Sequence, residues 1–446
     1  EFPAELTTIQ SHAFENCSAL KNVVLPDGVT EIGESAFAGC NTLASLSLPE
    51  LSKNFLGCYF GADSSRENAD FVPQSLKSVV IKGGEEIAED AFSGCASLEQ
   101  IDIPEGVKKI SAAAFYGCTA LKSIALPETL AEIGGYSFAG CTSLTKINLP
   151  SGITEYPEGI FSGCTALQKV VVPNGAKEIG NRMFYGCSSL ADVTIPESTE
   201  TIGELAFFRC GALREIRLPA GVNTICLWAF YECTALEQIE IPEGVKELAE
   251  SAFYGCSALK SASLPKGLIK IGNNTFRGCT SLDEIILPDG LTELGSSAFF
   301  GCSSLKKIEL PDSVTKIGDN TFRECTSLSH VRLPAALTEI PSMMFTDCTS
   351  LETLDIPETV TKFGPGAFWN CSALRKILLP QGLTEISYSL FQNCSALESV
   401  NFPAGIKVIG DRAFVDCFSL KTASLPDGLR EIEEYAFAGC SALSSV

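Results

Sequence analysis

The cysteines are the residues of this chain whose type and spacing could do chemistry. The 446-residue sequence contains 20 of them, most at a fixed step of 23 residues. Cysteines in an ordered array could bind a metal, form disulfides or act as nucleophiles. The runs that keep the step are Cys17 and Cys40, and then Cys95, Cys118, Cys141, Cys164, Cys187, Cys210, Cys233, Cys256, Cys279, Cys302, Cys325, Cys348, Cys371, Cys394, Cys417 and Cys440.

Metal binding and thiol catalysis find little support in this spacing. The chain lacks any Cys-x-x-Cys pair of the kind that metal sites use. Stacked equivalent residues would lie about 4.8 Å apart, which a disulfide tolerates, but their side chains would point the same way. We therefore expect buried free thiols that pack as small hydrophobic groups, with disulfides as the alternative.

Cys58 and Cys226 fall outside the 23-residue step. Neither has a basic neighbour in sequence that would lower its thiol pKa, so we interpret both as core filler rather than reactive groups. Only two histidines occur, His12 and His330, so the sequence offers little support for histidine-based catalysis or metal binding. The sequence predicts a protein that is not an enzyme and that needs no cofactor or metal.

The elements that must position these cysteines recur with the same period, as residues 279–301 illustrate. The Leu-x-x-Ile-x-Leu segment at 282–287 alternates apolar and polar residues, which predicts a strand with one buried face. Pro-Asp-Gly at 288–290 predicts a tight turn. The Leu-Gly-x-x-Ala-Phe segment at 294–299 predicts a second short extended piece followed by a helical or 3₁₀ turn.

A period of this size is typical of a solenoid, in which no turn is stable without its neighbours. We predict a single solenoid of about nineteen 23-residue repeats over residues 1–446. Residues 50–75 interrupt the pattern, with Pro73 at a cysteine position, and we expect this insertion to bury its aromatic side chains against neighbouring turns. Neither end carries a polar capping turn, so we expect a fragment of a longer protein.

The repeats resemble the BspA-type leucine-rich repeat, also named the spirochaete-type repeat, along essentially the whole chain. The likeness rests on the pattern Cys-[Thr/Ser]-[Ser/Ala]-Leu-x-x-Ile-x-Leu-Pro-[Asp/Glu]-Gly, as at residues 279–290. It implies an α/β fold: a right-handed solenoid with a concave parallel sheet and short extended or 3₁₀ segments on the convex side. It also implies a secreted or cell-surface bacterial adhesin without catalytic residues.

Two polar positions in each predicted strand should face solvent on the concave side. Their residues vary from turn to turn while the apolar framework stays constant. Such variation is expected of a binding surface and equally of a neutral solvent-exposed face. The candidate ligand-binding residues at these positions are Asp192, Glu215, Arg217, Gln238, Glu240, Lys307, Glu309, His330, Arg332 and Asp355.

A second candidate surface follows the core phenylalanine of each repeat. The position after it is aromatic in several consecutive turns and is interrupted by Arg277. Exposed aromatic side chains with arginine are common anchors of protein interfaces, although these rings could equally pack on one another. The candidate residues of this aromatic flank are Tyr185, Phe208, Tyr231, Tyr254 and Phe300.

Charge limits the partners of the chain. The 54 acidic and 32 basic residues give a net charge of −22, which disfavours nucleic acid and anionic membranes, and no apolar stretch is long enough to span a membrane. At one position of the second extended segment, glutamates such as Glu293 and Glu339 alternate with Lys270 and Lys316. We expect this stripe to be structural, with a calcium site as the weaker alternative.

Taken together, these features predict a non-catalytic scaffold that binds proteins or glycans of the host matrix or of other cells. A passive spacer or stalk of a cell-surface protein is the alternative. The sequence specifies neither the ligand nor the oligomeric state.

Overall fold

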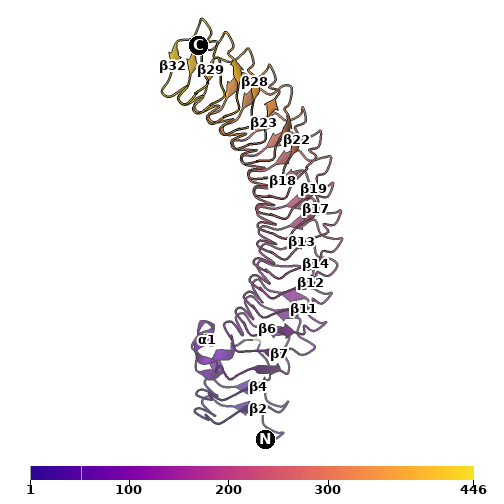
Figure 1. Cartoon of the computed structure of the whole chain (residues 1–446). Coiled ribbons are helices and arrows are strands. Elements are labelled where there is room, and N and C mark those ends of the chain that lie inside the picture. The colour runs from indigo at the N-terminus through magenta and orange to yellow at the C-terminus, as the bar shows by residue number, and fades with distance from the viewer. Residues whose placement is uncertain (1, 52) are drawn as a thin grey trace. The chain divides into compact units, whose positions relative to one another are not determined.

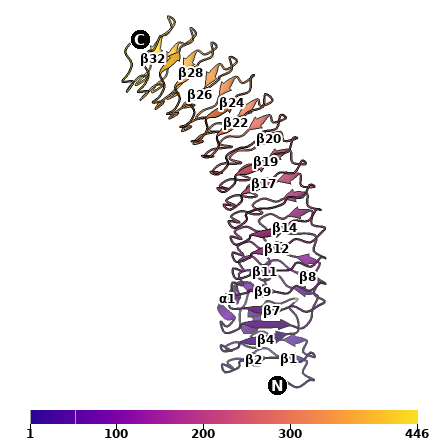
Figure 2. The same ribbon diagram turned by 45° about the vertical axis from the view of Figure 1, so that its right-hand side comes forward.

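The computed structural model describes residues 2–51 and 53–446. Glu1 of the predicted solenoid and Ser52 of the predicted insertion lie outside the described residues. The chain forms two compact units, Glu1–Gly221 (unit 1) and Val222–Val446 (unit 2). Both units repeat one turn: a strand of a first parallel sheet, a proline turn, a strand of a second parallel sheet and a segment of tight turns (Figures 1 and 2). That both units belong to a single solenoid stays a prediction.

The Leu-x-x-Ile-x-Leu segments form the first sheet, as predicted. Neighbouring strands are parallel and pair residues one repeat apart, so that Lys307 lies beside His330 and Glu309 beside Arg332. Each three-residue strand buries its middle residue and exposes the other two. In unit 1 the strands are β2 (Asn22–Val23), β4 (Ser45–Leu48), β5 (Ser78–Ile81), β7 (Gln100–Asp102), β9 (Ser123–Ile124), β11 (Lys146–Ile147), β12 (Lys169–Val171) and β14 (Asp192–Thr194). In unit 2 they are β17 (Gln238–Glu240), β19 (Ser261–Ser263), β22 (Lys307–Glu309), β24 (His330–Arg332), β26 (Thr353–Leu354), β28 (Lys376–Leu378) and β30 (Ser399–Asn401).

The second sheet consists of two-residue strands that follow the proline turn. Strands β20 and β21 are parallel and pair Lys270 with Glu293 and Ile271 with Leu294, of which the two apolar residues are buried. In unit 1 the strands are β1 (Thr8–Ile9), β3 (Glu31–Ile32), β6 (Glu86–Ile87), β8 (Lys109–Ile110), β10 (Glu132–Ile133), β13 (Glu178–Ile179) and β15 (Thr201–Ile202). In unit 2 they are β16 (Thr224–Ile225), β18 (Glu247–Leu248), β20 (Lys270–Ile271), β21 (Glu293–Leu294), β23 (Lys316–Ile317), β25 (Glu339–Ile340), β27 (Lys362–Phe363), β29 (Glu385–Ile386), β31 (Val408–Ile409) and β32 (Glu431–Ile432).

Tight turns follow the second strand in place of the helical or 3₁₀ turn that the sequence predicts there. Two residues of each segment adopt left-handed backbone angles, for example Ser297 with φ 55° and Gly301 with φ 72°. A left-handed residue ends a right-handed helix, so no helical turn can continue through both positions. The segment forms single tight turns, as where Phe300 N–H donates to the carbonyl of Ser297 at 3.1 Å, and it also bonds to the next turn, where Phe299 N–H donates to the carbonyl of Thr321 at 3.0 Å.

Close approach of neighbouring turns explains the glycine that follows the second strand. A Cβ atom added to Gly295 would lie 2.4 Å from the backbone nitrogen of Asn273 in the preceding turn. Gly295 therefore permits a very close approach of the two turns. Other repeats carry Ser111, Cys226 or Pro341 at this position, so the backbone there also accommodates a side chain.

Columns of identical side chains form the interior of each unit. In unit 2, Phe253, Phe276 and Phe299 are fully buried, and their neighbouring ring centroids lie 5.6 and 5.5 Å apart. Cys279 and Leu282 of the intervening turn are equally buried. Burial of this apolar surface drives folding, and because the columns cross from turn to turn, each turn depends on its neighbours.

The insertion at 50–75 contains helical segments that the repeats lack: η1 (Leu56–Phe60), η2 (Ser65–Glu67) and α1 (Asn68–Phe71). Figure 1 shows α1 at the side of unit 1, away from β7. The ring centroid of Phe60 lies 6.4 Å from that of Phe37, so Phe60 continues the column of core phenylalanines through the insertion. Burial of the insertion's aromatic side chains is confirmed for Tyr59 and Phe60 but wrong for Phe71, which is 45% exposed.

Buried polar contacts anchor the insertion to the repeats. Asn68 is fully buried; its Oδ1 accepts a 2.7 Å hydrogen bond from Gly57 N–H, and its Nδ2 donates to the carbonyl of Asp90 at 3.2 Å. Pro73 takes the cysteine position, as predicted. Its carbonyl accepts a 2.9 Å hydrogen bond from Leu76 N–H, as the carbonyl of Cys40 does from Leu43 N–H.

Candidate binding faces

Sixteen of the eighteen ladder cysteines are buried as free thiols, which confirms the prediction for them, whereas Cys17 is exposed and Cys440 half-buried. Most ladder thiols donate to the preceding turn, as Cys279 Sγ–H does to the carbonyl of Phe253 at 3.3 Å. Burial raises the pKa of these thiols, to about 12 at Cys141 and at Cys256. A thiol with so high a pKa stays protonated at neutral pH and is a poor nucleophile and metal ligand.

The remaining cysteine and histidine side chains differ in their exposure. Cys58 is buried in η1, where desolvation raises its pKa to about 12, so its interpretation as core filler is confirmed. Cys226 is half-buried and Cys17 is exposed. His12 Nδ1 lies 3.1 Å from Glu15 Oε2 on the surface of unit 1, and His330 is exposed on β24.

All ten residues predicted for the concave sheet are exposed on the outward side of the first-sheet segments. Seven of them lie within β14, β17, β22 and β24, whereas Glu215, Arg217 and Asp355 lie outside the strands. The structure brings four together in unit 2, since β22 and β24 pair in register. This cluster consists of Lys307, Glu309, His330 and Arg332.

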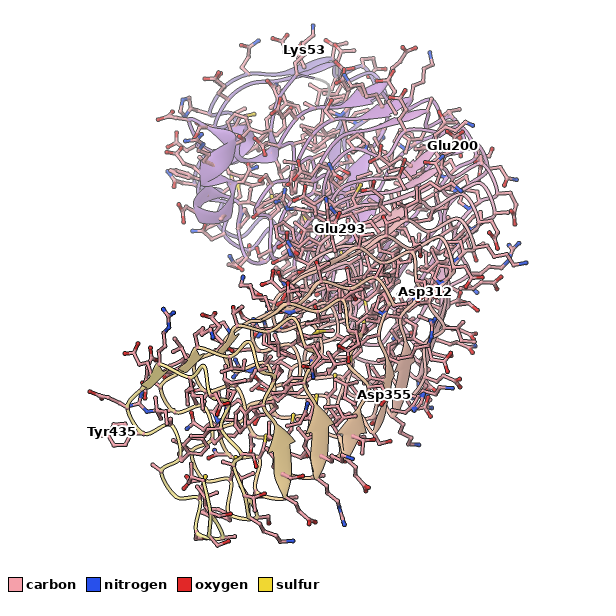
Figure 3. The ribbon with its side chains drawn as sticks, turned by 90° about the horizontal axis from the view of Figure 1, so that it is seen from above. Lys53, Glu200, Glu293, Asp312, Asp355 and Tyr435 are labelled. Atoms are coloured by element: carbon pink, nitrogen blue, oxygen red, sulfur yellow. The ribbon has the colours of Figure 1, made fainter. Side chains whose placement is uncertain are left out.

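Each of the two predicted arginines forms an ion pair with an acidic residue of a proline turn. Arg332 Nη2 lies 2.7 Å from Asp312 Oδ2 in unit 2, and Arg217 Nη1 lies 2.5 Å from Glu197 Oε1 in unit 1. The Ala335 N–H and the Arg332 guanidinium hold the pKa of Asp312 below its usual value. Figure 3 shows Asp312 and Asp355 at the surface. Sequence reasoning missed these partners, which stand 20 residues before each arginine at the Pro-[Asp/Glu] position.

The aromatic flank exists, but its rings pack largely on one another. All five predicted residues are half-buried. Arg277 is enclosed on both sides, with its Cζ 5.7 Å from the ring centroid of Tyr254 and 4.2 Å from that of Phe300. The stacked pairs are Tyr185 with Phe208, at 4.7 Å, and Tyr231 with Tyr254, at 4.5 Å. These contacts make the flank a partly exposed packing layer.

The outward positions of the second sheet carry the predicted stripe of alternating charge. Opposite charges on neighbouring strands form ion pairs, which supports a structural role for the stripe. The pairs are Lys109 with Glu86 at 3.1 Å, Lys270 with Glu293 at 3.0 Å and Lys362 with Glu339 at 2.7 Å. Among residues 2–51 and 53–446, no three histidine, cysteine or acidic side chains are placed so that they could hold a metal ion.

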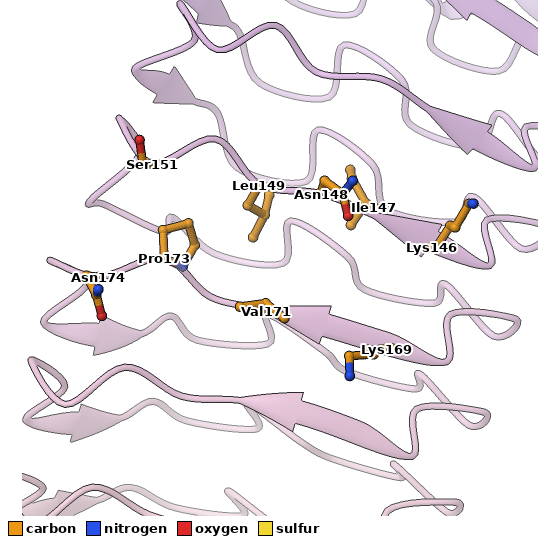
Figure 4. Close-up of a pocket in the computed structure, with 9 residues that line it drawn as sticks. All are labelled: Lys146, Ile147, Asn148, Leu149, Ser151, Lys169, Val171, Pro173 and Asn174. Carbon is orange, nitrogen blue, oxygen red and sulfur yellow. The ribbon is translucent and has the colours of Figure 1, made fainter.

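A groove of about 680 Å³ lies on the first sheet of unit 1, at a position that sequence reasoning missed (Figure 4). It spans two neighbouring turns, where β11 and β12 place Lys146 beside Lys169. The signal in the sequence is a pair of lysines at one strand position of consecutive repeats in an acidic chain. The lining residues are Lys146, Ile147, Asn148, Leu149, Ser151, Lys169, Val171, Pro173 and Asn174.

The stacked turns, parallel sheets and open exposed faces define a leucine-rich-repeat protein. The family model described as BspA type Leucine rich repeat region matches residues 1–82, 85–214, 200–328, 247–375 and 366–446. The chain belongs to this family, as the resemblance of its repeats implies. Across the part of the chain that the structure describes, no helix is both long and apolar enough to cross a membrane.

The chain is also similar to several solved structures. A leucine-rich repeat protein from Bacteroides ovatus is 26% identical, covers 100% of this chain and 93% of its own, and has a TM-score of 0.55. A T. pallidum leucine-rich repeat protein is 32% identical over 41% of this chain and 77% of its own, with a TM-score of 0.31. A leucine-rich cell surface protein from Faecalibacterium prausnitzii is 24% identical over 90% of this chain and 86% of its own, with a TM-score of 0.34. No curated protein matches the chain.

Proposed function

We propose that the chain is a non-catalytic, protein-binding scaffold, secreted or held at the bacterial cell surface, that acts as an adhesin for host matrix or plasma proteins or for other cells. One observation carries the proposal. The inward residues of the first sheet are apolar and buried in successive turns, whereas the outward residues change in charge and size. Such a face can acquire a binding specificity without disturbing the core. Membership of the BspA-type family supports the location and the role.

The arginines are the proposed anchors of this recognition face. Arg217 is 76% and Arg332 47% exposed at the side chain, and each is oriented by one acidic residue of a proline turn. A guanidinium has five N–H donors. The carboxylate and, at Arg332, the carbonyl of Leu310 at 2.9 Å occupy some of them, which leaves others for a ligand. Arginine is also enriched among the residues that dominate binding energy at protein interfaces. The other proposed residues of the face are Asp192, Glu215, Gln238, Glu240, Lys307, Glu309, His330 and Asp355.

The proposal is tested by measuring binding of the whole chain to a panel of purified host matrix and plasma proteins on a sensor surface. We expect saturable binding to at least one of them, weakened roughly tenfold in the variant R217E/R332E. The matched control is R430E, which changes an exposed arginine beside the second sheet. Absence of saturable binding would favour a passive spacer or stalk instead. Equal binding by the unchanged chain, R217E/R332E and R430E would do the same.

The aromatic flank is a second proposed surface. Arg277 sits between two rings, and a guanidinium held in this way presents its edge to a partner at little entropic cost. R277A should weaken binding to the same protein if the flank takes part, and should leave the affinity unchanged if the rings serve only to pack the turns. The same sensor measurement distinguishes the two results.

A further inference from the structure

We propose that the groove lined by Lys146 and Lys169 binds a carboxylate-bearing sugar residue of a glycan. The inference rests on the proposed function, because it uses the outward face of the first sheet, but it assigns a separate site in unit 1 and a ligand class. No residue of the groove belongs to the proposed protein-binding residues.

Two lysines lie side by side in the groove. Lys146 on β11 lies directly opposite Lys169 on β12, and like charges at opposite positions destabilise a sheet. Lys169 is neutralised on its far side, where its Nζ lies 2.6 Å from Asp192 Oδ2. Lys146 has Ser123 as its other neighbour in the sheet. The groove therefore holds an ammonium group whose strand neighbours offer it no opposite charge.

The second sheet of the same unit shows that this arrangement is not imposed by the fold. There Lys109 stands between Glu86 and Glu132, so the lysine has an acidic neighbour on each side. The same turn can therefore place compensating charges side by side. Lys146 lacks a compensating neighbour of this kind, which makes its position a candidate functional site.

The lining of the groove identifies the chemistry of the ligand. Figure 4 shows the two lysines at one end, Val171 in the middle, and Ser151 and Asn174 at the other end. Val171 is 49% exposed and offers an apolar surface in the middle of the groove. A sugar acid offers a carboxylate to Lys146, the C–H face of its ring to Val171, and hydroxyl groups to the serine and asparagine. The volume of about 680 Å³ falls within the range of small-ligand sites.

Sheet topology argues against an extended acidic peptide as the ligand. Strands β11 and β12 are internal to the order β14-β12-β11-β9, so the backbone of both is already hydrogen-bonded on either side. A peptide cannot add to this sheet as a further strand at the groove, which is the mode by which extended peptides gain main-chain hydrogen bonds. Recognition must come from side chains, as it does for glycans.

The test is calorimetric titration of the whole chain at low salt with two acidic probes, tri-galacturonic acid and 3′-sialyllactose. The neutral comparisons are methyl-esterified tri-galacturonic acid and lactose, and a hexaglutamate peptide represents the rival ligand. K146S removes the ammonium without breaking the Lys169–Asp192 pair. The control K122S removes an exposed lysine that pairs with Glu99 at 3.1 Å outside the groove.

We expect at least one acidic sugar to bind, its neutral counterpart not to bind, and K146S but not K122S to weaken binding roughly tenfold. Binding of tri-galacturonic acid or of sialyllactose alone tells which acid is recognised. Failure of both sugars to bind, equal loss in both variants, or binding of hexaglutamate in preference to the sugars overturns the inference. None of these results bears on protein binding, which is measured with R217E/R332E.

Discussion

The outward faces of the two sheets differ in how regularly their charges alternate. In the second sheet of unit 2, lysine and glutamate alternate and pair over successive turns, as Lys270 does with Glu293 at 3.0 Å. In the first sheet, Lys146 stands beside Lys169. Because both faces cover the same buried columns, the fold tolerates either arrangement. The comparison teaches that the interior specifies the structure, which leaves the charge pattern of the first sheet available for recognition.

The largest effect expected from this account is an abrupt alkaline unfolding. The protein has 17 buried cysteines, and burial raises the pKa of Cys141 and Cys256 to about 12 from an ordinary value of 9.0. The folded state keeps these protons and the unfolded state releases them. Stability is therefore fully present below the unfolded pKa and falls above about pH 9, by about 1.4 kcal/mol per pH unit for each such thiol.

Circular dichroism and thiolate absorbance recorded against pH check this expectation. Because many thiols act together, unfolding and thiolate formation should occur in one cooperative step within roughly a pH unit of the onset. A folded protein whose thiols ionise gradually up to about pH 11 would show that the columns are open to water.

The next largest effect is expected from a single cavity in the interior. F276A removes one ring from a stacked, fully buried column and should lower the free energy of unfolding by about 3–5 kcal/mol. E284A, which changes an exposed residue of the same turn, should alter it by less than about 0.5 kcal/mol. Denaturant unfolding measures both. Similar values for the two variants would remove the distinction between interior and face.

The smallest effects compare the two faces directly. K109E removes the ion pair with Glu86 and extends the acidic run of Glu132, Glu155 and Glu178 to five consecutive turns. It should lower the free energy of unfolding by about 0.5–1 kcal/mol. K146S relieves the repulsion with Lys169 and should raise it by about 0.2–1 kcal/mol. Thermal unfolding at low salt measures the opposite signs. If K146S is destabilising, Lys146 serves the fold and not a ligand.

The period alone made much of the fold predictable. Cys279, Ile285 and Phe299 recur at fixed spacing, and only a stack of turns buries all of them together. The left-handed angle of Ser297 could not be predicted, because serine adopts many backbone conformations and the contact with the next turn selects this one. The exposure of Phe71 could not be predicted either, because the insertion has no equivalent in the other repeats from which its packing could be inferred.

The candidate sites were predictable only in part. Exposure of the outward residues follows from strand alternation, so Lys307 and Arg332 were found where expected. The partner Asp312 was missed because the ion pair joins a strand to the proline turn of the preceding repeat. The groove at Lys146 depends on the shape left between two turns, which residue types do not reveal.

Thiol labelling tests the central claim, that side chains one period apart form closed internal columns, most directly. In the folded protein at neutral pH, we expect rapid reaction of the exposed Cys17 and slower reaction of the half-buried Cys226 and Cys440. After denaturation without reductant, all 20 thiols should react. Rapid labelling of ladder cysteines such as Cys279 in the folded protein, or fewer than 20 reactive thiols in the denatured one, would contradict the account.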